Sequence, residues 1–251
     1  MNRTLVKILT VMLGVAAGVC VLASIVVADS GRHDQPGIAP IDSYPLGKSY
    51  GAWVKDWWTW RLETPYDINP AVNNNPCSGG QNGNVWFLAS DAFVDYWTSP
   101  GVPENRECTV PEGTSLFFPL INNGYFAWST DLKSEQIKSF VRKVTLCDGP
   151  VHLSVKIDGK SVDNPEQYYE ESPYFSINLP ANNIYKAPPT SYTADVWYPS
   201  ADTGYYLFLR PLSVGRHTIE WTADWHKCGY AQYLTPNMYF ITNYTINVTH
   251  R

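Results

Sequence analysis

The feature that most constrains the fold is a two-residue alternation of apolar and polar side chains in the C-terminal half of the chain. Residues 151–158 and 215–226 alternate in this way, and so does the stretch from Tyr244 to Thr249. Because successive side chains of a strand point to opposite faces, each stretch is predicted to be a strand with one buried face. Several short strands separated by turns predict a mainly β fold, an antiparallel β-sandwich or jelly-roll-like domain.

Further strands are predicted from apolar stretches bounded by turn residues. We expect strands at 84–90, 172–179 and 204–212, and a strand, turn and strand at 108–121. The stretch 204–212 is apolar at both alternating positions, which is typical of a central strand. Two short helices are expected, one near 51–64 that ends at Pro65 and one at 131–146, and they would cover an edge or an end of the β layers.

The first predicted helix is rich in tryptophan. The sequence GAWVKDWWTWRLETP places Trp53, Trp57, Trp58 and Trp60 within eight positions. We expect this wide apolar face of an amphipathic helix to pack against the β layer, because buried indoles remove a large apolar area from water. Trp58 borders the polar side of the helix and is therefore the candidate for stacking on a sugar ring. Arg61 follows Trp57 by about one turn and is positioned to stack on it.

The N-terminal segment predicts export. Two basic residues, Arg3 and Lys7, precede the uncharged run from Ile8 to Ala28, which is the layout of a cleaved secretory signal. The run is also long enough to remain as a membrane anchor, in which case residues 8–28 would be the membrane contact. Residues 29–48 form a predicted extended lead-in, and 49–251 a single β-rich domain that is secreted, periplasmic or displayed at the cell surface.

Charge and motifs exclude several classes of function. Without residues 1–28 the chain has 16 basic and 23 acidic residues, a net charge of −7. An acidic chain without a basic stripe is a poor nucleic-acid binder. The sequence contains no P-loop, no HExxH metal motif and no GxSxG elbow, so no cofactor and no metal are predicted. A Ser-His-Asp set assembled only by the fold stays open, because such sets follow no fixed order in the sequence. The sequence does not indicate an oligomeric state.

Four cysteines follow the N-terminal segment: Cys77, Cys108, Cys147 and Cys228. An even number in an oxidising compartment predicts two disulfides. Three pairings are possible. We favour Cys77–Cys108 and Cys147–Cys228, since the first pair encloses one loop-rich unit.

Three groups of polar residues are candidate sites. On the predicted strand 215–226, Asp224 and His226 share a face and form a possible acid/base pair. Asp91 belongs to an acidic loop, and Asn74 and Asn82 belong to an amide-rich loop with hydrogen-bonding groups for sugar hydroxyls. Ordinary solvated surface explains each group without any function, and we favour this interpretation for all three. The last predicted strand also contains two N-glycosylation sequons, at Asn243 and Asn247, which we interpret as polar strand residues.

Several phrases together resemble a family of exported, mostly bacterial proteins. They are the GxWxxxWWxW helix, CTVPEGTSLFFPLIN at 108–122 and GYYLFLRPLSVGRHTIEW at 204–221, with VWFLA, VKIDGKSV and SPYFSINLPANNI. The resemblance implies export and a single β-rich domain over nearly all of 49–250. It supplies no activity, ligand or catalytic residue.

Two functions from different classes fit these observations. The first is an exported, non-catalytic β-domain with a binding or structural role, whose ligand is a glycan or a cell-envelope component. The alternative is an exported hydrolase that acts on polysaccharide or ester, with acids brought together by the fold. The absence of a catalytic motif favours the first.

Overall fold

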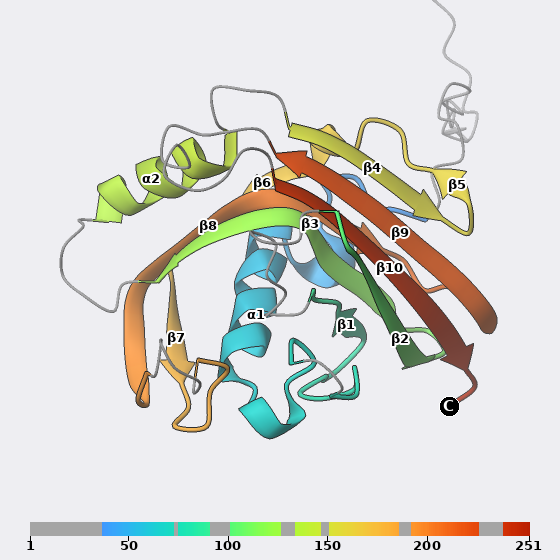
Figure 1. Cartoon of the computed structure of the whole chain (residues 1–251), viewed down its shortest axis with the longest axis horizontal. Helices are drawn as coiled ribbons and strands as arrows, with labels where there is room; N and C mark the ends of the chain where they lie inside the picture. The colour runs from blue at the N-terminus through green and yellow to red at the C-terminus, as the bar shows by residue number, and fades with distance from the viewer. Residues whose placement is uncertain are drawn as a thin grey trace, which may run out of the picture. The chain divides into compact units, whose positions relative to one another are not determined.

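The computed structural model describes residues 37–72, 75–90, 101–126, 134–146, 151–185, 192–225 and 238–251. It is mainly β, with two sheets and two α-helices, which confirms the predicted sandwich-like class (Figure 1). Among these residues no helix is long and apolar enough to cross a membrane. The helices and strands are η1 (Pro45–Gly47), α1 (Tyr50–Glu63), η2 (Tyr66–Ile68), β1 (Val85–Phe87), β2 (Pro103–Pro111), β3 (Ser115–Phe126), α2 (Ser134–Leu146), β4 (Val151–Ile157), β5 (Lys160–Ser161), η3 (Pro165–Tyr168), β6 (Tyr169–Glu171), β7 (Phe175–Leu179), β8 (Asp195–Leu209), β9 (Gly215–Trp225) and β10 (Met238–Thr249).

The strands form two five-stranded sheets. The first sheet has the order β1-β3-β8-β6, with β7 also paired to β8, and the second has the order β2-β10-β9-β4-β5. Most pairs are antiparallel, as predicted, but β1 runs parallel to β3 and β2 runs parallel to β10. The sheets are therefore mixed, which corrects the purely antiparallel expectation.

The turn between β2 and β3 carries the chain from the second sheet to the first. The two strands do not form a hairpin, because β2 pairs with β10 in the second sheet and β3 pairs with β8 in the first. Gly113 has a φ of +78° in this turn, a conformation that suits glycine. The backbone N–H of Glu112 donates to the carbonyl of Thr249, so the turn is fastened to the end of β10. The chain thus changes sheets within a few residues.

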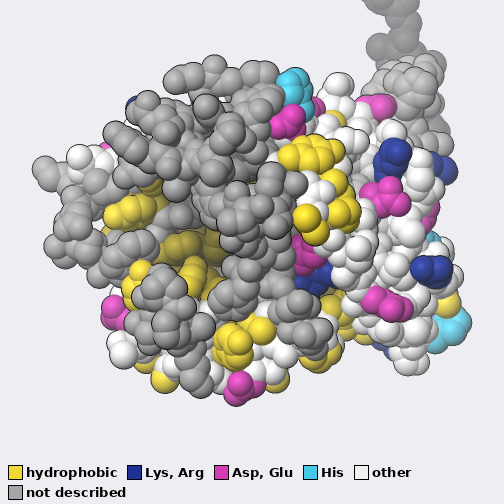
Figure 2. All heavy atoms as spheres, viewed as in Figure 1, with side chains coloured by type: hydrophobic (Ala, Val, Ile, Leu, Met, Phe, Trp, Pro, Cys, Tyr) yellow, Lys and Arg dark blue, Asp and Glu magenta, His cyan; other side chains and the backbone are white. Residues whose placement is uncertain are grey.

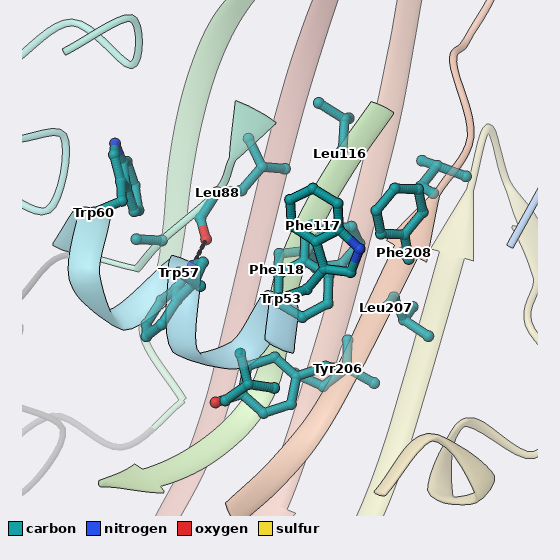
Figure 3. Close-up of a cluster of buried hydrophobic side chains, with 14 of the residues drawn as sticks. Trp53, Trp57, Trp60, Leu88, Leu116, Phe117, Phe118, Tyr206, Leu207 and Phe208 are labelled. Atoms are coloured by element: carbon teal, nitrogen blue, oxygen red, sulfur yellow. Dashed lines mark hydrogen bonds between the residues drawn. The ribbon is translucent and has the colours of Figure 1, made fainter. Parts of the chain in front are cut away.

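The first sheet is packed on both faces. On one face Phe117, Tyr206 and Phe208 lie against the tryptophans of α1 (Figure 3). On the other face Phe118 stacks on Trp221 of β9, with ring centroids 5.1 Å apart. Residues 200–209 of β8 are all buried, which confirms the prediction of a central strand. The core therefore has two apolar layers, one on each side of β3 and β8.

Helix α1 forms one of these layers. Ser49 caps its N-terminus by accepting from the backbone N–H of Ala52. Three indole N–H groups donate to backbone carbonyls: Trp53 to Pro45 at 3.0 Å, Trp57 to Leu88 at 2.8 Å and Trp60 to Gly79 at 3.1 Å. All four tryptophans of the helix are buried, so the packing interpretation of this segment is confirmed.

The helix is less amphipathic than predicted. Trp58, expected at the polar border, is buried against Phe126, with ring centroids 4.7 Å apart. The reason is that α1 contacts the first sheet on one side and the loop segments before β1 on another, which leaves a narrow exposed strip. The guanidinium of Arg61 lies 5.3 Å from the Trp57 ring centroid, as predicted.

The packed part of the chain includes residues before position 49. Ile38 forms an antiparallel bridge with Leu209, and the N–H of Ala39 donates to Phe208. Both Ile38 and Ala39 are buried, so this part of the expected lead-in extends the first sheet at the end of β8.

The predicted disulfide between Cys77 and Cys108 is present, with Cα atoms 5.5 Å apart. It ties the loop that precedes β1 of the first sheet to β2 of the second sheet. Cys147 and Cys228 lie outside the described residues, so their pairing stays a prediction.

Removing this disulfide is expected to lower the stability of the domain. The bond closes a loop with a sequence separation of 31 residues, for which the loss of chain entropy in the unfolded state corresponds to about 3.7 kcal/mol. The Cys77→Ser/Cys108→Ser variant should therefore unfold at lower urea concentration than the parent, with an m-value at least as large, because the unfolded chain without the cross-link exposes more surface. An identical midpoint would contradict this prediction.

Candidate binding face of the second sheet

The outer face of the second sheet is broad and mostly polar. On β9, Ile219, Trp221 and Ala223 are buried, whereas Glu220 is exposed and Asp224 is partly exposed, which confirms the predicted alternation. The strands β4 and β10 alternate in the same register, so four adjacent strands present one face to solvent. Their outward residues include Asn105, Glu107, His152, Ser154, Lys156, Thr218, Glu220, Thr222, Asp224, Tyr239, Ile241, Asn243 and Thr245.

An apolar group interrupts this polar face where β10 begins beside β2. It consists of Val102, Pro103, Tyr239 and Ile241, which we call the Tyr239 patch; Tyr239 is 38% exposed and Val102 56% exposed. Gly101, whose N–H donates to the Tyr239 carbonyl, lies directly beneath the tyrosine ring, since an added Cβ would lie 3.3 Å from the ring. Figure 2 shows hydrophobic side chains gathered over this region, next to acidic and histidine side chains.

Asp224 lies beside this patch, in a row across three strands. It is the register partner of Tyr239 on β10 and of His152 on β4. Side chains directly opposite one another on neighbouring strands have Cβ atoms about 4.5–5.5 Å apart. The face thus brings an aromatic ring, a carboxylate and an imidazole together. Farther along β10, an amide side chain, Asn243, points outward on the same face.

Sequence reasoning found one member of this row and missed two. Asp224 was predicted. Its expected partner His226 lies outside the described residues, and His152 of β4 faces Asp224 across the strand pair. The alternation in 151–157 signalled that His152 points outward. The sequence did not show that β4 pairs with β9, because alternation indicates which side chains of a strand point outward but not which strand lies beside it.

The two sequon asparagines lie on the same face, in an internal strand. The Asn243 side-chain amide donates to Asn105 at 3.0 Å, and that of Asn247 donates to Glu107 at 2.7 Å. Both side chains thus link β10 to β2, in keeping with their interpretation as polar strand residues.

The remaining predicted site residues are dispersed. Asn82 is exposed and forms an isolated bridge with Val85. Asn74 and Asp91 lie outside the described residues. Trp58, the proposed sugar-stacking residue, is only 8% exposed and lies in the core. Within the described part of the chain, no three His, Cys, Asp or Glu side chains come together as metal ligands.

Trp58 instead adjoins a buried polar cluster that the sequence did not reveal. Tyr206 donates to Asp202 at 2.6 Å, and the Asn122 amide contacts both Tyr206, at 2.9 Å, and Asp202, at 3.3 Å. Among the described residues, no acceptor meets hydrogen-bond geometry for the indole N–H of Trp58. Gly124 makes room for this indole, since a Cβ there would lie 2.9 Å from it.

The carboxyl of Asp202 is strongly perturbed by this environment. Burial raises its pKa to about 7, and the hydrogen bonds from Tyr206 and Asn122, together with the nearby indole N–H of Trp58, offset only part of the effect. Because the cluster lies beneath α1 and Asp202 is 1% exposed, it cannot meet a ligand in this conformation. We therefore assign Asp202 a structural role and place the candidate site on the outer face of the second sheet.

Comparisons with known proteins add little. No protein-family model and no curated protein matches the chain. Among solved structures, the chain is weakly similar to a cysteine protease inhibitor from Entamoeba histolytica (11% identity, 59% of this chain and 93% of the other, TM-score 0.19). It is also weakly similar to the Plasmodium falciparum protein Pf12p (9% identity, 59% of this chain and 42% of the other, TM-score 0.22) and to PbICP-C in complex with falcipain-2 (9% identity, 67% and 100%, TM-score 0.21).

Proposed function

We propose that this chain is an exported, non-catalytic binding domain, and that its ligand is a glycan of the cell envelope or its surroundings. The observation that carries the proposal is the row of Tyr239, Asp224 and His152 on an open face of the second sheet. Aromatic rings bind sugars through the apolar faces of the pyranose, and neighbouring polar groups fix the hydroxyls. The Tyr239 patch would contact the apolar face of the sugar, and Asp224 and His152 beside it would hydrogen-bond to the hydroxyls.

Export is part of the proposal. It is supported by the apolar run 8–28 after two basic residues and by the disulfide between Cys77 and Cys108, a bond that persists in oxidising compartments. The motifs that resemble exported bacterial proteins agree with this location.

A hydrolase is the second candidate, because Asp224 and His152 face one another in an otherwise sugar-binding surface. Two observations favour binding over turnover. The face belongs to a regular sheet, with side chains that spread over four strands, whereas hydrolysis requires groups that converge on one bond. A second carboxylate on the same face, Glu220, lies four residues along β9, about 13 Å from Asp224, which is too far for a glycosidase pair.

Replacing Tyr239 by alanine is expected to weaken glycan binding at least tenfold. The change removes a ring contact of about 1.5–3 kcal/mol. Asp224→Asn should weaken binding less, because the amide keeps some hydrogen bonding. The purified protein would first be applied to a glycan array, and the best ligand would then be titrated by calorimetry.

Tyr44→Ala is the matched control, since Tyr44 is 71% exposed on the loop before α1 and away from this face. Its affinity should equal that of the parent. Binding that survives Tyr239→Ala and Asp224→Asn would place the glycan site elsewhere. Release of reducing sugar by the parent, abolished in a stably folded Asp224→Asn variant, would replace the binding proposal with the hydrolase.

A further inference from the structure

A separate pocket lies at one end of the two sheets, where residues 210–214 carry the chain from β8 to β9. Its volume is about 280 Å³. It is lined by Gly37, Ile157, Asp158, Lys160, Leu209, Arg210, Pro211, Leu212, Ser213 and His217. Ile157 from the second sheet and Leu209 from the first are buried, so the pocket has an apolar floor at the junction of the sheets.

Three of the lining residues form an Asp-His-Ser set. His217 Nδ1 lies 2.7 Å from Asp158 Oδ2, and its Nε2 lies 3.4 Å from Ser213 Oγ. However, Nε2 is closer to the backbone carbonyl of Ser213, at 2.9 Å. A catalytic histidine must offer an unprotonated Nε2 to the serine hydroxyl, whereas here both ring nitrogens face acceptor oxygens, Nδ1 that of Asp158 and Nε2 the Ser213 carbonyl. The set is therefore a structural clamp on the loop and not a nucleophilic triad.

The hydrogen bonds that hold His217 also favour its charged form. Burial alone would lower the pKa of His217, but the bonds to Asp158 and to the Ser213 carbonyl together outweigh burial and raise it. Asp158 accepts a further bond from the N–H of Thr218, at 2.9 Å. The charges of His217 and Asp158 are thus directed at each other, which leaves the two other charged residues of the pocket, Lys160 and Arg210, to determine its net charge.

Lys160 and Arg210 are both exposed, and neither forms a salt bridge with a described residue. They give the pocket a positive rim in a chain whose net charge is −5. A positive rim above an apolar floor is complementary to an organic anion with a short apolar part. The volume is near the lower limit of the roughly 300–1,000 Å³ typical of ligand pockets, which suits a small molecule or one end group of a larger one.

We propose that this pocket binds a small organic anion, a carboxylate or a phosphate monoester, whose charge contacts Lys160 and Arg210 and whose apolar part lies against Ile157 and Leu209. The site is independent of the glycan face, because the two share no residue. Its clamp of Asp158, His217 and Ser213 keeps the loop 210–214 in place around the ligand.

The test uses three probes of similar apolar size: hexanoate, pentyl phosphate and hexanol. The purified protein would be titrated with each while amide resonances are followed by NMR. We expect one or both anions to shift resonances of residues 157–160 and 209–217 with saturation, and hexanol to bind at least tenfold more weakly. The anion that binds more tightly identifies the carboxylate or the phosphate as the preferred group.

The decisive variant is Lys160→Gln/Arg210→Gln, in which anion affinity should fall at least tenfold. Lys156→Gln/Arg216→Gln is the matched control, since it removes two exposed cations of β4 and β9 that do not line the pocket. Equal binding of hexanol, or undiminished anion binding by the first variant, would overturn the proposal. Tyr239→Ala should bind the anion like the parent, so a failure here is distinguishable from a failure of the glycan proposal.

Discussion

Replacing Trp57 by alanine is expected to lower the free energy of unfolding by about 3–5 kcal/mol, the range for large aromatic truncations in cores. Trp57 is 2% exposed and packs against Trp58, Trp60 and Tyr206. Its indole also donates to the Leu88 carbonyl at 2.8 Å, and the truncation leaves that acceptor without this donor. The loss therefore combines a cavity between α1 and the first sheet with a broken hydrogen bond.

Chemical denaturation of the parent, Trp57→Ala and Trp57→Phe would measure this effect. Phenylalanine keeps most of the apolar volume and should recover more than half of the lost stability. Tyr44→Ala, on an exposed side chain, should change stability by less than about 0.5 kcal/mol. A Trp57→Ala protein that unfolds like the parent would mean that α1 does not contribute to the core.

The second large effect is a gain in stability from Asp202→Asn at alkaline pH. The pKa of Asp202 is raised to about 7 in the folded protein, from about 3.9 in the unfolded chain. The folded state therefore retains the proton more tightly, and ionisation destabilises the fold progressively as pH rises from about 4 to about 7. Above that range the cost is constant, at about 4 kcal/mol.

Asparagine cannot ionise. At pH 8 the free energy of unfolding of Asp202→Asn should therefore exceed that of the parent by about 2–4 kcal/mol. The amide must still fit the hydrogen bonds of Tyr206 and Asn122, which is why we expect less than the full cost to be recovered. At pH 4 the gain should vanish. Denaturation curves at several pH values provide the measurement, with Asp42→Asn as the exposed control. A difference that is independent of pH would contradict the assignment of a raised pKa.

The sequence predicted the faces of strands better than their neighbours. The alternation at 219–224 and 244–249 correctly separated buried from outward residues, because burial of one face selects apolar side chains at every second position. The first half of β2, PENRE, has no such pattern and was missed; Glu104 and Arg106 occupy its inward positions, where they form a salt bridge at 3.0 Å. Charged side chains that form an ion pair can thus occupy inward positions at which strand alternation predicts apolar residues.

The candidate sites depend even more on which strands and turns lie side by side, which the sequence does not show. Asp224 was recognised from the sequence, but Tyr239 and His152 join it only through strand pairing. The pocket residues Asp158, Lys160 and Arg210 also come from separate turns, and no spacing along the chain signals that they meet. Trp58 was expected at the polar border of α1, because its partner Phe126 lies on a strand whose position over the helix the sequence does not specify.

The parallel pairing of β2 with β10 has a kinetic consequence. It joins residues 103–111 to residues 241–249, and β10 is an internal strand of the second sheet. Contacts between segments so distant along the chain require closure of a long loop and slow the formation of the native state. The second sheet cannot be completed until β10 has left the ribosome. If the chain is exported, as we propose, and crosses the membrane unfolded, such delayed completion would keep the nascent polypeptide competent for translocation.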